Sequence, residues 1–158
     1  VETTLMLFHK KYPDVEVMVS GSTEESLLGD EQHLGEALYN LLTNAHEACL
    51  LSGKIEERLE LVVHGERLYV GFEVRDNGPG ITKQEQRRIF DPFYTSKNTN
   101  FNWGMGLHYV REIVKSHFGK LRLESRPGEG SSFFVTIPRY EPRKASASKT
   151  GSGLFMRL

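Results

Sequence analysis

Two runs of alternating apolar residues, joined by a tight turn, restrict the fold of this chain more than any other feature. They are "RLELVVH" (58–64) and "RLYVGFEVR" (67–75), connected through a His-Gly-Glu turn. A period of two predicts β-strands, and so short a connection predicts an antiparallel hairpin. A second hairpin is predicted for "KLRLESR" (120–126) and "SSFFVTIP" (131–138) around the turn "PGEG". Because parallel strands need long crossover connections, these hairpins argue against a doubly wound parallel sheet.

Helices are predicted where apolar residues recur at spacings of three and four. The clearest covers residues 31–51, with Asp30 as the expected N-cap. Thr82 and Glu85 have the spacing of a capping box, and Gly119 is the expected C-cap of a later helix. The full set of predicted segments is helices over 1–11, 31–51, 82–90 and 106–118 and strands over 15–20, 58–64, 67–75, 120–126 and 131–138. Since hairpins and helices interleave, we expect an α+β fold, a two-layer sandwich whose mixed, mostly antiparallel sheet carries helices on one face.

Length and composition exclude several classes of protein. The chain has 158 residues, enough for one domain with its own core. Its 20 basic and 21 acidic residues give a net charge of −1, which does not favour binding to nucleic acid. The single cysteine, Cys49, excludes an internal disulfide and fits a reducing compartment. No apolar run approaches the roughly 18 residues of a membrane span, and the opening residues lack the pattern of a signal peptide.

A polar stripe lies on the longest predicted helix. Glu36, Asn40 and Asn44 are four residues apart, so that they share one face, while the leucines cover the others. Amide oxygens are hard ligands that suit Mg²⁺. A solvated helix surface is the alternative reading of the same stripe.

Two glycine-rich stretches follow. In "DNGPG" (76–80) a strand ends, Asp76 can accept a hydrogen bond from an exocyclic amine, and Gly80 allows a flat ring to approach the backbone. An ordinary turn is the alternative. In "NWGMGLHYV", Gly104 and Gly106 precede a helix, and exposed N–H groups at a helix start favour anions such as phosphate. Lys97 in the preceding loop is a further candidate phosphate donor, or a solvated lysine.

These motifs, in this order, resemble the catalytic ATP-binding domain of two-component sensor histidine kinases, in the GHKL superfamily. The segment "NLLTNA" (40–45) resembles the N box of that family, and "DNGPG" its G1 box. The segments "IFDPFYTSK" (89–97), "GMGL" (104–107) and "GEGSSFFVTIP" (128–138) resemble the F box, the G2 box and the closing strands. The match covers about residues 1–140. The resemblance implies the Bergerat ATP-binding fold, with ATP and Mg²⁺ bound together.

The resemblance also implies a role for each matching residue. Asn44 takes the position that coordinates Mg²⁺, and Asn40 the position on the phosphate side. Asp76 takes the position that recognises the adenine amino group, and Ser131 lies near an adenine-bound water. The other implied nucleotide contacts are Gly78, Gly80, Lys97, Gly104, Gly106 and Leu107. Glu36, one turn before Asn40, is a candidate acid/base or orienting residue, or else a helix-surface glutamate.

Asn40 distinguishes between branches of the superfamily. The ATPases that resemble this pattern carry a glutamate there as a base, and an amide accepts no proton at neutral pH. We therefore expect transfer of the γ-phosphoryl group to a histidine elsewhere. The alternatives are an ATPase of the same fold and a non-catalytic, nucleotide-dependent interaction module. His46 is rejected as the phospho-acceptor because no H box surrounds it.

The same resemblance implies an organisation and partners. We expect residues 1–140 to form the domain, in which residues 1–11 are the end of a helix or linker from a missing dimerisation domain. Residues 141–158 are rich in Ser, Lys and Gly, and we expect them to form a flexible tail. The expected partners are that upstream phospho-acceptor domain and a response regulator, with no nucleic acid. We expect a homodimer for the full-length protein, a monomer for the isolated domain, and a cytoplasmic location, including the cytoplasmic part of a membrane-anchored sensor.

Overall fold

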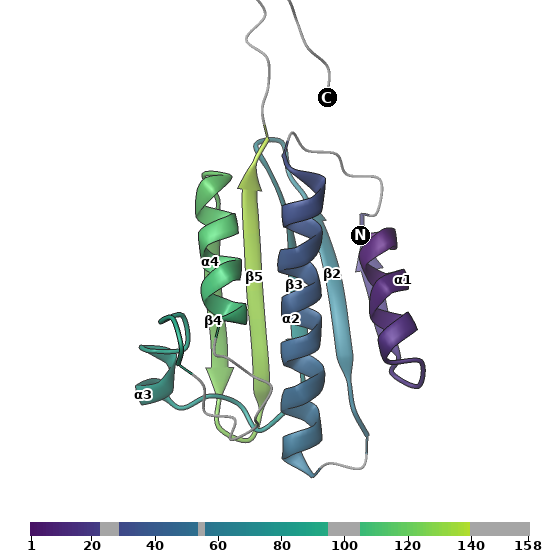
Figure 1. The fold of residues 1–158 in the computed structure, drawn as a ribbon, viewed down its shortest axis with the longest axis vertical. Coiled ribbons are helices and arrows are strands. Elements are labelled where there is room, and N and C mark those ends of the chain that lie inside the picture. Colours follow the sequence, from purple (N-terminus) through teal and green to yellow (C-terminus); the bar gives the residue numbers. More distant parts are fainter. Residues whose placement is uncertain (23–28, 54–55, 95–104, 140–158) are drawn as a thin grey trace, which may run out of the picture.

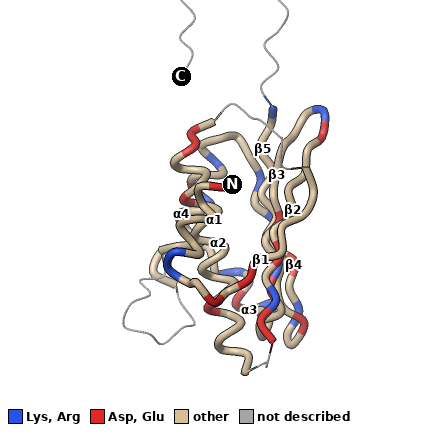
Figure 2. Tube along the Cα trace, turned by 90° about the vertical axis from the view of Figure 1, so that its right-hand side faces the viewer, with Lys and Arg blue, Asp and Glu red and all other residues tan. Residues whose placement is uncertain are grey.

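The computed structural model describes residues 1–22, 29–53, 56–94 and 105–139 and arranges them in two layers (Figure 1). Among these residues five strands form one sheet, in the order β1-β2-β3-β5-β4. Their bounds are β1 Val17–Gly21, β2 Leu59–Gly65, β3 Tyr69–Asp76, β4 Lys120–Arg126 and β5 Gly130–Pro138. The helices α1, α2 and α4 lie on one side of the sheet, as the view turned by 90° shows (Figure 2). The predicted α+β sandwich is therefore confirmed.

The sheet is mixed, as predicted from the hairpins. Strand β1 pairs with β2 in parallel, whereas the pairs β2–β3, β3–β5 and β4–β5 are antiparallel. In the central ladder Val74 pairs with Phe133 and Asp76 with Ser131. This register places the end of β3 beside the start of β5, so that two of the predicted site residues lie on neighbouring strands.

Helix α2 (Glu31–Ser52) is the longest element and confirms the helix predicted over residues 31–51. The carboxylate of Asp30 caps its first turn by accepting a hydrogen bond from the backbone N–H of His33 at 3.0 Å. Its last turn ends at Gly53, whose φ of 64° is left-handed. The residues that it buries are Ala37, Leu38, Leu41, Leu42, Ala45, His46 and Cys49. Burying each large aliphatic side chain stabilises the fold by about 1.5–3 kcal/mol.

The remaining helices pack beside α2. Helix α1 (Glu2–Lys11) buries Phe8, whose side chain contacts the ring of Tyr39 on α2 edge-on at 6.4 Å. Helix α4 (Gly106–Ser116) buries Val110, Ile113 and Val114 between α2 and the sheet. No helix among the described residues is both long enough and apolar enough to cross a bilayer.

Two predicted helix ends differ in the structure. Helix α3 is only the single turn Lys83–Gln86, although the predicted capping box between Thr82 and Glu85 is present. At the end of α4 the left-handed residue is Phe118 (φ 56°), and Gly119 is not the C-cap that we expected. Gly119 is needed for a different reason, because a Cβ there would lie 2.5 Å from Cδ1 of Ile137 and 2.6 Å from the carbonyl oxygen of Thr136.

Candidate functional site

Asp76 ends β3 in a buried position, with 8% of its surface exposed. Its Oδ1 accepts a hydrogen bond of 2.8 Å from the backbone N–H of Gly78. Ser131, opposite Asp76 on β5, is equally buried, and its hydroxyl lies 3.0 Å from that of Ser125 on β4. The structure thus brings together two residues that are 55 positions apart in the sequence and that were both predicted to lie near an adenine ring.

Gly78 places the end of β3 against α2. A Cβ at Gly78 would lie 3.0 Å from Cβ of Ala48 and 2.8 Å from Oδ1 of Asp76, so that a side chain there would displace one of them. Ala48 lies one helical turn after Asn44 and continues the stripe of Glu36, Asn40 and Asn44. The predicted acidic turn therefore contacts the same helix that carries the predicted amides.

Asn77 is a residue of this turn that the sequence analysis did not single out. Its Oδ1 accepts hydrogen bonds from the backbone N–H of Arg58 at 3.0 Å and from the thiol of Cys49 at 3.2 Å, and its Nδ2 donates to the carbonyl of Glu56 at 2.8 Å. Burial, and then the nearby charge of Asp76, raise the pKa of the Cys49 thiol. Asn77 ties the turn to the chain that leaves α2. The one feature of the sequence that pointed to this structural role of Asn77 is its position directly between Asp76 and Gly78.

Gly80 is required by the packing of the turn itself. Its φ of 72° is left-handed, and a Cβ would lie 2.0 Å from the carbonyl oxygen of Arg126. The backbone N–H of Gly128 donates to the carbonyl of Pro79 at 2.7 Å, which joins the same two turns. The need for glycine at position 80 follows from contact with the β4–β5 turn and does not depend on a ligand.

The start of α4 lies against α2 at Asn40. The Nδ2 of Asn40 donates to the backbone carbonyl of Glu36 at 2.8 Å, while its Oδ1 lies 3.1 Å from the point where a Cβ of Gly106 would be. Leu107, next along α4, is partly buried against the core. The first predicted asparagine and the second glycine of the "GMG" motif are therefore neighbours.

The two glycine motifs contact α2 at positions 40 and 48, and Asn44 lies between these positions on the same stripe. Eight residues of helix span about 12 Å along the axis. Asn44 is half-buried there. Lys97 and Gly104, the other two predicted site residues, lie outside the described residues. Asp76, Gly78 and Gly80 lie at or just after the end of β3, with Ser131 opposite on β5, and Gly106 and Leu107 lie at the start of α4. Asn40 and Asn44 lie on the stretch of α2 between these two places, and Glu36 lies one turn before it.

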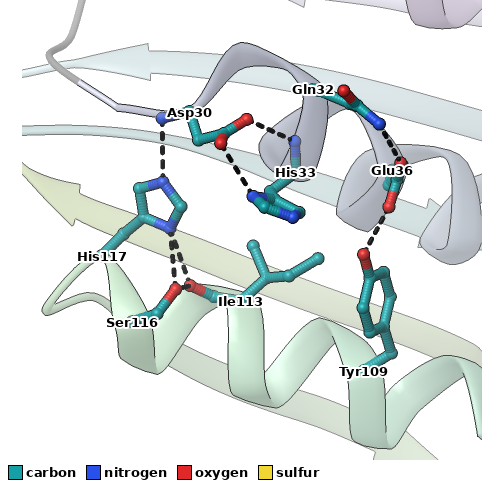
Figure 3. A network of polar contacts seen from close by, with 8 residues as sticks. All are labelled: Asp30, Gln32, His33, Glu36, Tyr109, Ile113, Ser116 and His117. Atoms are coloured by element: carbon teal, nitrogen blue, oxygen red, sulfur yellow. Dashed lines mark hydrogen bonds and ion pairs between the residues drawn. The ribbon is translucent and has the colours of Figure 1, made fainter.

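Glu36 makes polar contacts with α4 in a network that runs along the two helices (Figure 3). One carboxylate oxygen accepts from the side chain of Gln32 at 3.1 Å, and the other accepts from the hydroxyl of Tyr109 on α4. These hydrogen bonds, that of Tyr109 foremost, hold the pKa of Glu36 below its usual value, and the contact with Glu36 raises the pKa of Tyr109. At the far end of α4, Nε2 of His117 accepts from the backbone N–H of Asp30 at 3.0 Å.

His46 lies outside this arrangement. Its Nδ1 is 2.7 Å from a carboxylate oxygen of Glu57, and its ring centroid lies 4.5 Å from that of Tyr12, the residue just after α1. With 8% of its surface exposed, His46 joins α2 to the end of α1 and to the chain just before β2. These contacts give His46 a packing role in the structure.

The chain is similar in sequence to a known family and to curated proteins. A family model described as "Histidine kinase-, DNA gyrase B-, and HSP90-like ATPase" matches residues 29–141. The adaptive-response sensory kinase SasA of Prochlorococcus marinus is 33% identical over 124 residues, which are 77% of this chain and 32% of that protein. The chain therefore spans about a third of the length of this relative.

Two solved structures share the fold. A mycobacterial sensor histidine kinase, MprB, superposes with a TM-score of 0.73 at 25% identity, over 87% of this chain and 91% of that one. The nucleotide-free catalytic domain of the histidine kinase ThkA superposes with a TM-score of 0.72 at 26% identity, over 87% and 88% of the two chains. Since the family model covers well over half of the sequence, the chain belongs to the histidine kinase-, DNA gyrase B- and HSP90-like ATPase family.

Proposed function

We propose that the chain is the ATP-binding catalytic domain of a sensor histidine kinase and that it transfers the γ-phosphoryl group of ATP to a histidine of an upstream dimerisation domain. The observation that carries this proposal is the single stripe on α2 that is contacted by both glycine motifs, by Gly106 at Asn40 and by Gly78 at Ala48. The separation of about 12 Å between these contacts suits a nucleotide lying along the helix, with its base at one end and its phosphates at the other.

The adenine end of the proposed site is the buried end of β3. The carboxylate of Asp76 is a strong acceptor, held in place by the N–H of Gly78, and it suits the exocyclic amine of adenine. Ser131 adds a hydroxyl beside it, on the paired strand. We therefore assign recognition of the base to this buried carboxylate, whose charge strengthens the hydrogen bond and whose fixed orientation directs it.

The phosphate end is the start of α4. The N–H groups of its first turn, beginning at Gly106, carry the positive end of the helix dipole and suit a phosphate. The side-chain oxygen of the half-buried Asn44 fits Mg²⁺, because this ion is usually held by one or two protein oxygens together with phosphate oxygens. When bound, Mg²⁺ would neutralise charge on the phosphates. Lys97 and Gly104 are proposed to complete this end.

The chemistry assigned to the chain is positioning and charge stabilisation. Asn40 carries an amide whose Nδ2 donates to the carbonyl of Glu36, which fixes its orientation. An amide accepts no proton at neutral pH, so this side chain cannot act as a base that activates water. We therefore favour transfer to a histidine over hydrolysis. The proposed context is a cytoplasmic homodimer that contains the phospho-acceptor histidine and passes the phosphoryl group to a response regulator.

The experiment that tests this proposal compares the 158-residue chain with the full-length protein that contains it. Both are incubated with ATP labelled in the γ-phosphate and with Mg²⁺. We expect the chain to bind the nucleotide without labelling itself and without rapid release of phosphate, and the full-length protein to become labelled on histidine. Rapid phosphate release by the chain alone would contradict the proposal in favour of an ATPase. Failure of the chain to bind ATP would favour a non-catalytic module.

A further inference from the structure

The contact between Tyr109 and Glu36 joins the two helices that make up the phosphate end of the proposed site (Figure 3). Tyr109 lies one turn after Gly106 on α4, and Glu36 lies one turn before Asn40 on α2. Because the two helices run in opposite directions, the Glu36–Tyr109 hydrogen bond lies one turn away from the place where Oδ1 of Asn40 approaches Gly106.

Both carboxylate oxygens of Glu36 accept a hydrogen bond. Gln32 donates to Oε1 and Tyr109 donates to Oε2, and both bonds favour the ionised form. The other ionisable groups near this carboxylate are His33 in the first turn of α2 and Asp30, the N-cap of the same helix. A carboxylate that is held as a hydrogen-bond acceptor for a tyrosine is poorly suited to take a proton from a substrate.

The Tyr109–Glu36 pair also affects the orientation of the Asn40 side chain. The backbone carbonyl of Glu36 accepts the hydrogen bond from Nδ2 of Asn40, and that bond turns Oδ1 of Asn40 towards Gly106. Tyr109 therefore holds the side chain of Glu36, and the backbone carbonyl of Glu36 orients the amide of Asn40. The other end of α4 is joined to α2 separately, through His117 and Asp30. Loss of the Tyr109 contact would therefore remove a polar restraint from the first turn of α4 and leave the other end of the helix joined to α2.

We propose that Tyr109 and Glu36 are positioning residues, which hold the first turn of α4 in register with Asn40 for phosphoryl transfer, and that Glu36 is not an acid/base residue. This inference rests on the proposed kinase function. It adds a residue, Tyr109, for which the family resemblance implied no role, and it selects one of the readings that the sequence left open for Glu36.

The test measures autophosphorylation of the full-length protein with Tyr109→Phe, Glu36→Ala, Glu36→Gln and the double variant Tyr109→Phe/Glu36→Ala. We expect Tyr109→Phe and Glu36→Ala each to lower kcat about three- to tenfold, with a change in the KM for ATP of less than about twofold, because the base end of the site is untouched. The double variant should be no slower than either single variant, since both remove one interaction. Glu36→Gln should keep most of the activity, because its amide oxygen still accepts from Tyr109.

The control is Tyr69→Phe, a tyrosine at the opposite end of β3 from Asp76, which should match the unaltered protein. Thermal unfolding midpoints within a few degrees identify variants that have lost function without losing the fold. The inference is overturned if Tyr109→Phe has the unaltered kcat. It is also overturned if Glu36→Gln is as slow as Glu36→Ala and loses the acidic limb of the pH–rate profile, as removal of a base would require. If the unaltered protein does not label itself on histidine, the proposed function fails instead.

Discussion

Asp76 and Ser131 are paired directly across β3 and β5, and both residues are buried where β3 ends and β5 begins. The pairing gives a strand end with a carboxylate and a hydroxyl side by side, next to the glycine that packs on Ala48. This combination is the basis for assigning the base of the nucleotide to this end of the site.

Replacement of Asp76 by Asn should weaken binding of ATP. The amide oxygen can still accept from the N–H of Gly78, but the side chain loses the charge that strengthens a hydrogen bond from the adenine amine. We expect the affinity for a nonhydrolysable ATP analogue to fall about tenfold to a hundredfold, measured by isothermal titration calorimetry. The exposed Asp91→Asn serves as the control and should bind as the unaltered chain does. Equal affinities for Asp76→Asn and the unaltered chain would remove Asp76 from the site.

Replacement of Gly106 by Ala should affect the phosphate end. The added methyl group would lie 3.1 Å from Oδ1 of Asn40, so that either the amide or the start of α4 must move. We expect the affinity for the triphosphate analogue to fall about three- to tenfold and that for adenosine to stay within about twofold, since only the phosphates meet this turn.

The matched control for that substitution is Gly35→Ala. A Cβ at Gly35 would make a contact of similar closeness, 3.2 Å, with Oγ1 of Thr4 on α1. It should leave nucleotide affinity unchanged. An equal loss in both variants would mean that crowding of α2 in general, and not the contact at Asn40, lowers the affinity.

Replacement of Gly80 by Ala should destabilise the fold more than the same change at Gly128. Both glycines have a left-handed φ, 72° and 83°, but a Cβ at Gly80 would lie 2.0 Å from the carbonyl of Arg126, whereas one at Gly128 meets nothing within 4 Å. We expect the free energy of unfolding to fall by about 1 kcal/mol for Gly128→Ala and by at least about 2–3 kcal/mol for Gly80→Ala. Urea denaturation with an unchanged m-value measures both. Equal losses would show that strain in φ alone decides the cost.

Glu73 should make stability depend on pH in the acid range. Burial alone would raise the pKa of this carboxyl, but hydrogen bonds of 2.6 and 2.8 Å from the Arg75 guanidinium bring it below the ordinary value of 4.5. A lowered folded-state pKa means that the pair stabilises the protein above pH of about 4.5 and that this contribution is lost as pH falls through the folded value.

Glu73→Gln should therefore lower the free energy of unfolding by about 1–2 kcal/mol at pH 7 and flatten its decline below pH of about 4.5. The control is Glu124→Gln, an exposed partner of Arg122, which should change stability by less than about 0.5 kcal/mol. Chemical denaturation at pH 7, 5, 4 and 3 measures the two profiles. Parallel profiles for Glu73→Gln and the unaltered protein would refute the assignment.

Local patterns in the sequence were enough to predict the main elements and the fold class. Alternation identified β2 to β5, and the spacing of leucines identified α2 together with its cap at Asp30. The stripe of Glu36, Asn40 and Asn44 follows from helical geometry alone. These features depend on neighbours within a few residues, which is why they can be predicted without knowledge of the fold.

Features that depend on packing between distant segments were missed. The alternation of Val70, Phe72 and Val74 leaves Glu73 on the opposite face of β3, where a solvated side chain is the ordinary expectation, yet only 2% of its surface is exposed. The hydrogen bond between Tyr109 and Glu36, 73 positions apart in the sequence, depends on the register between α2 and α4. We predicted Gly119 as the left-handed residue that ends α4, because glycine is the usual residue there, but that residue is Phe118. Glycine is required at position 119 for another reason, its close contact with β5.

The central claim is that one nucleotide lies along α2 between Asp76 and Gly106, and an NMR titration of the ¹⁵N-labelled chain tests it most directly. A nonhydrolysable ATP analogue is added with Mg²⁺, and the backbone amide shifts are followed. We predict saturable shifts at Gly78 and Gly80, at Asn40 and Asn44, and at Gly106, with those near Asn44 depending on Mg²⁺. The absence of saturable shifts at these amides, or shifts confined to the face of the sheet opposite the helices, would contradict the account.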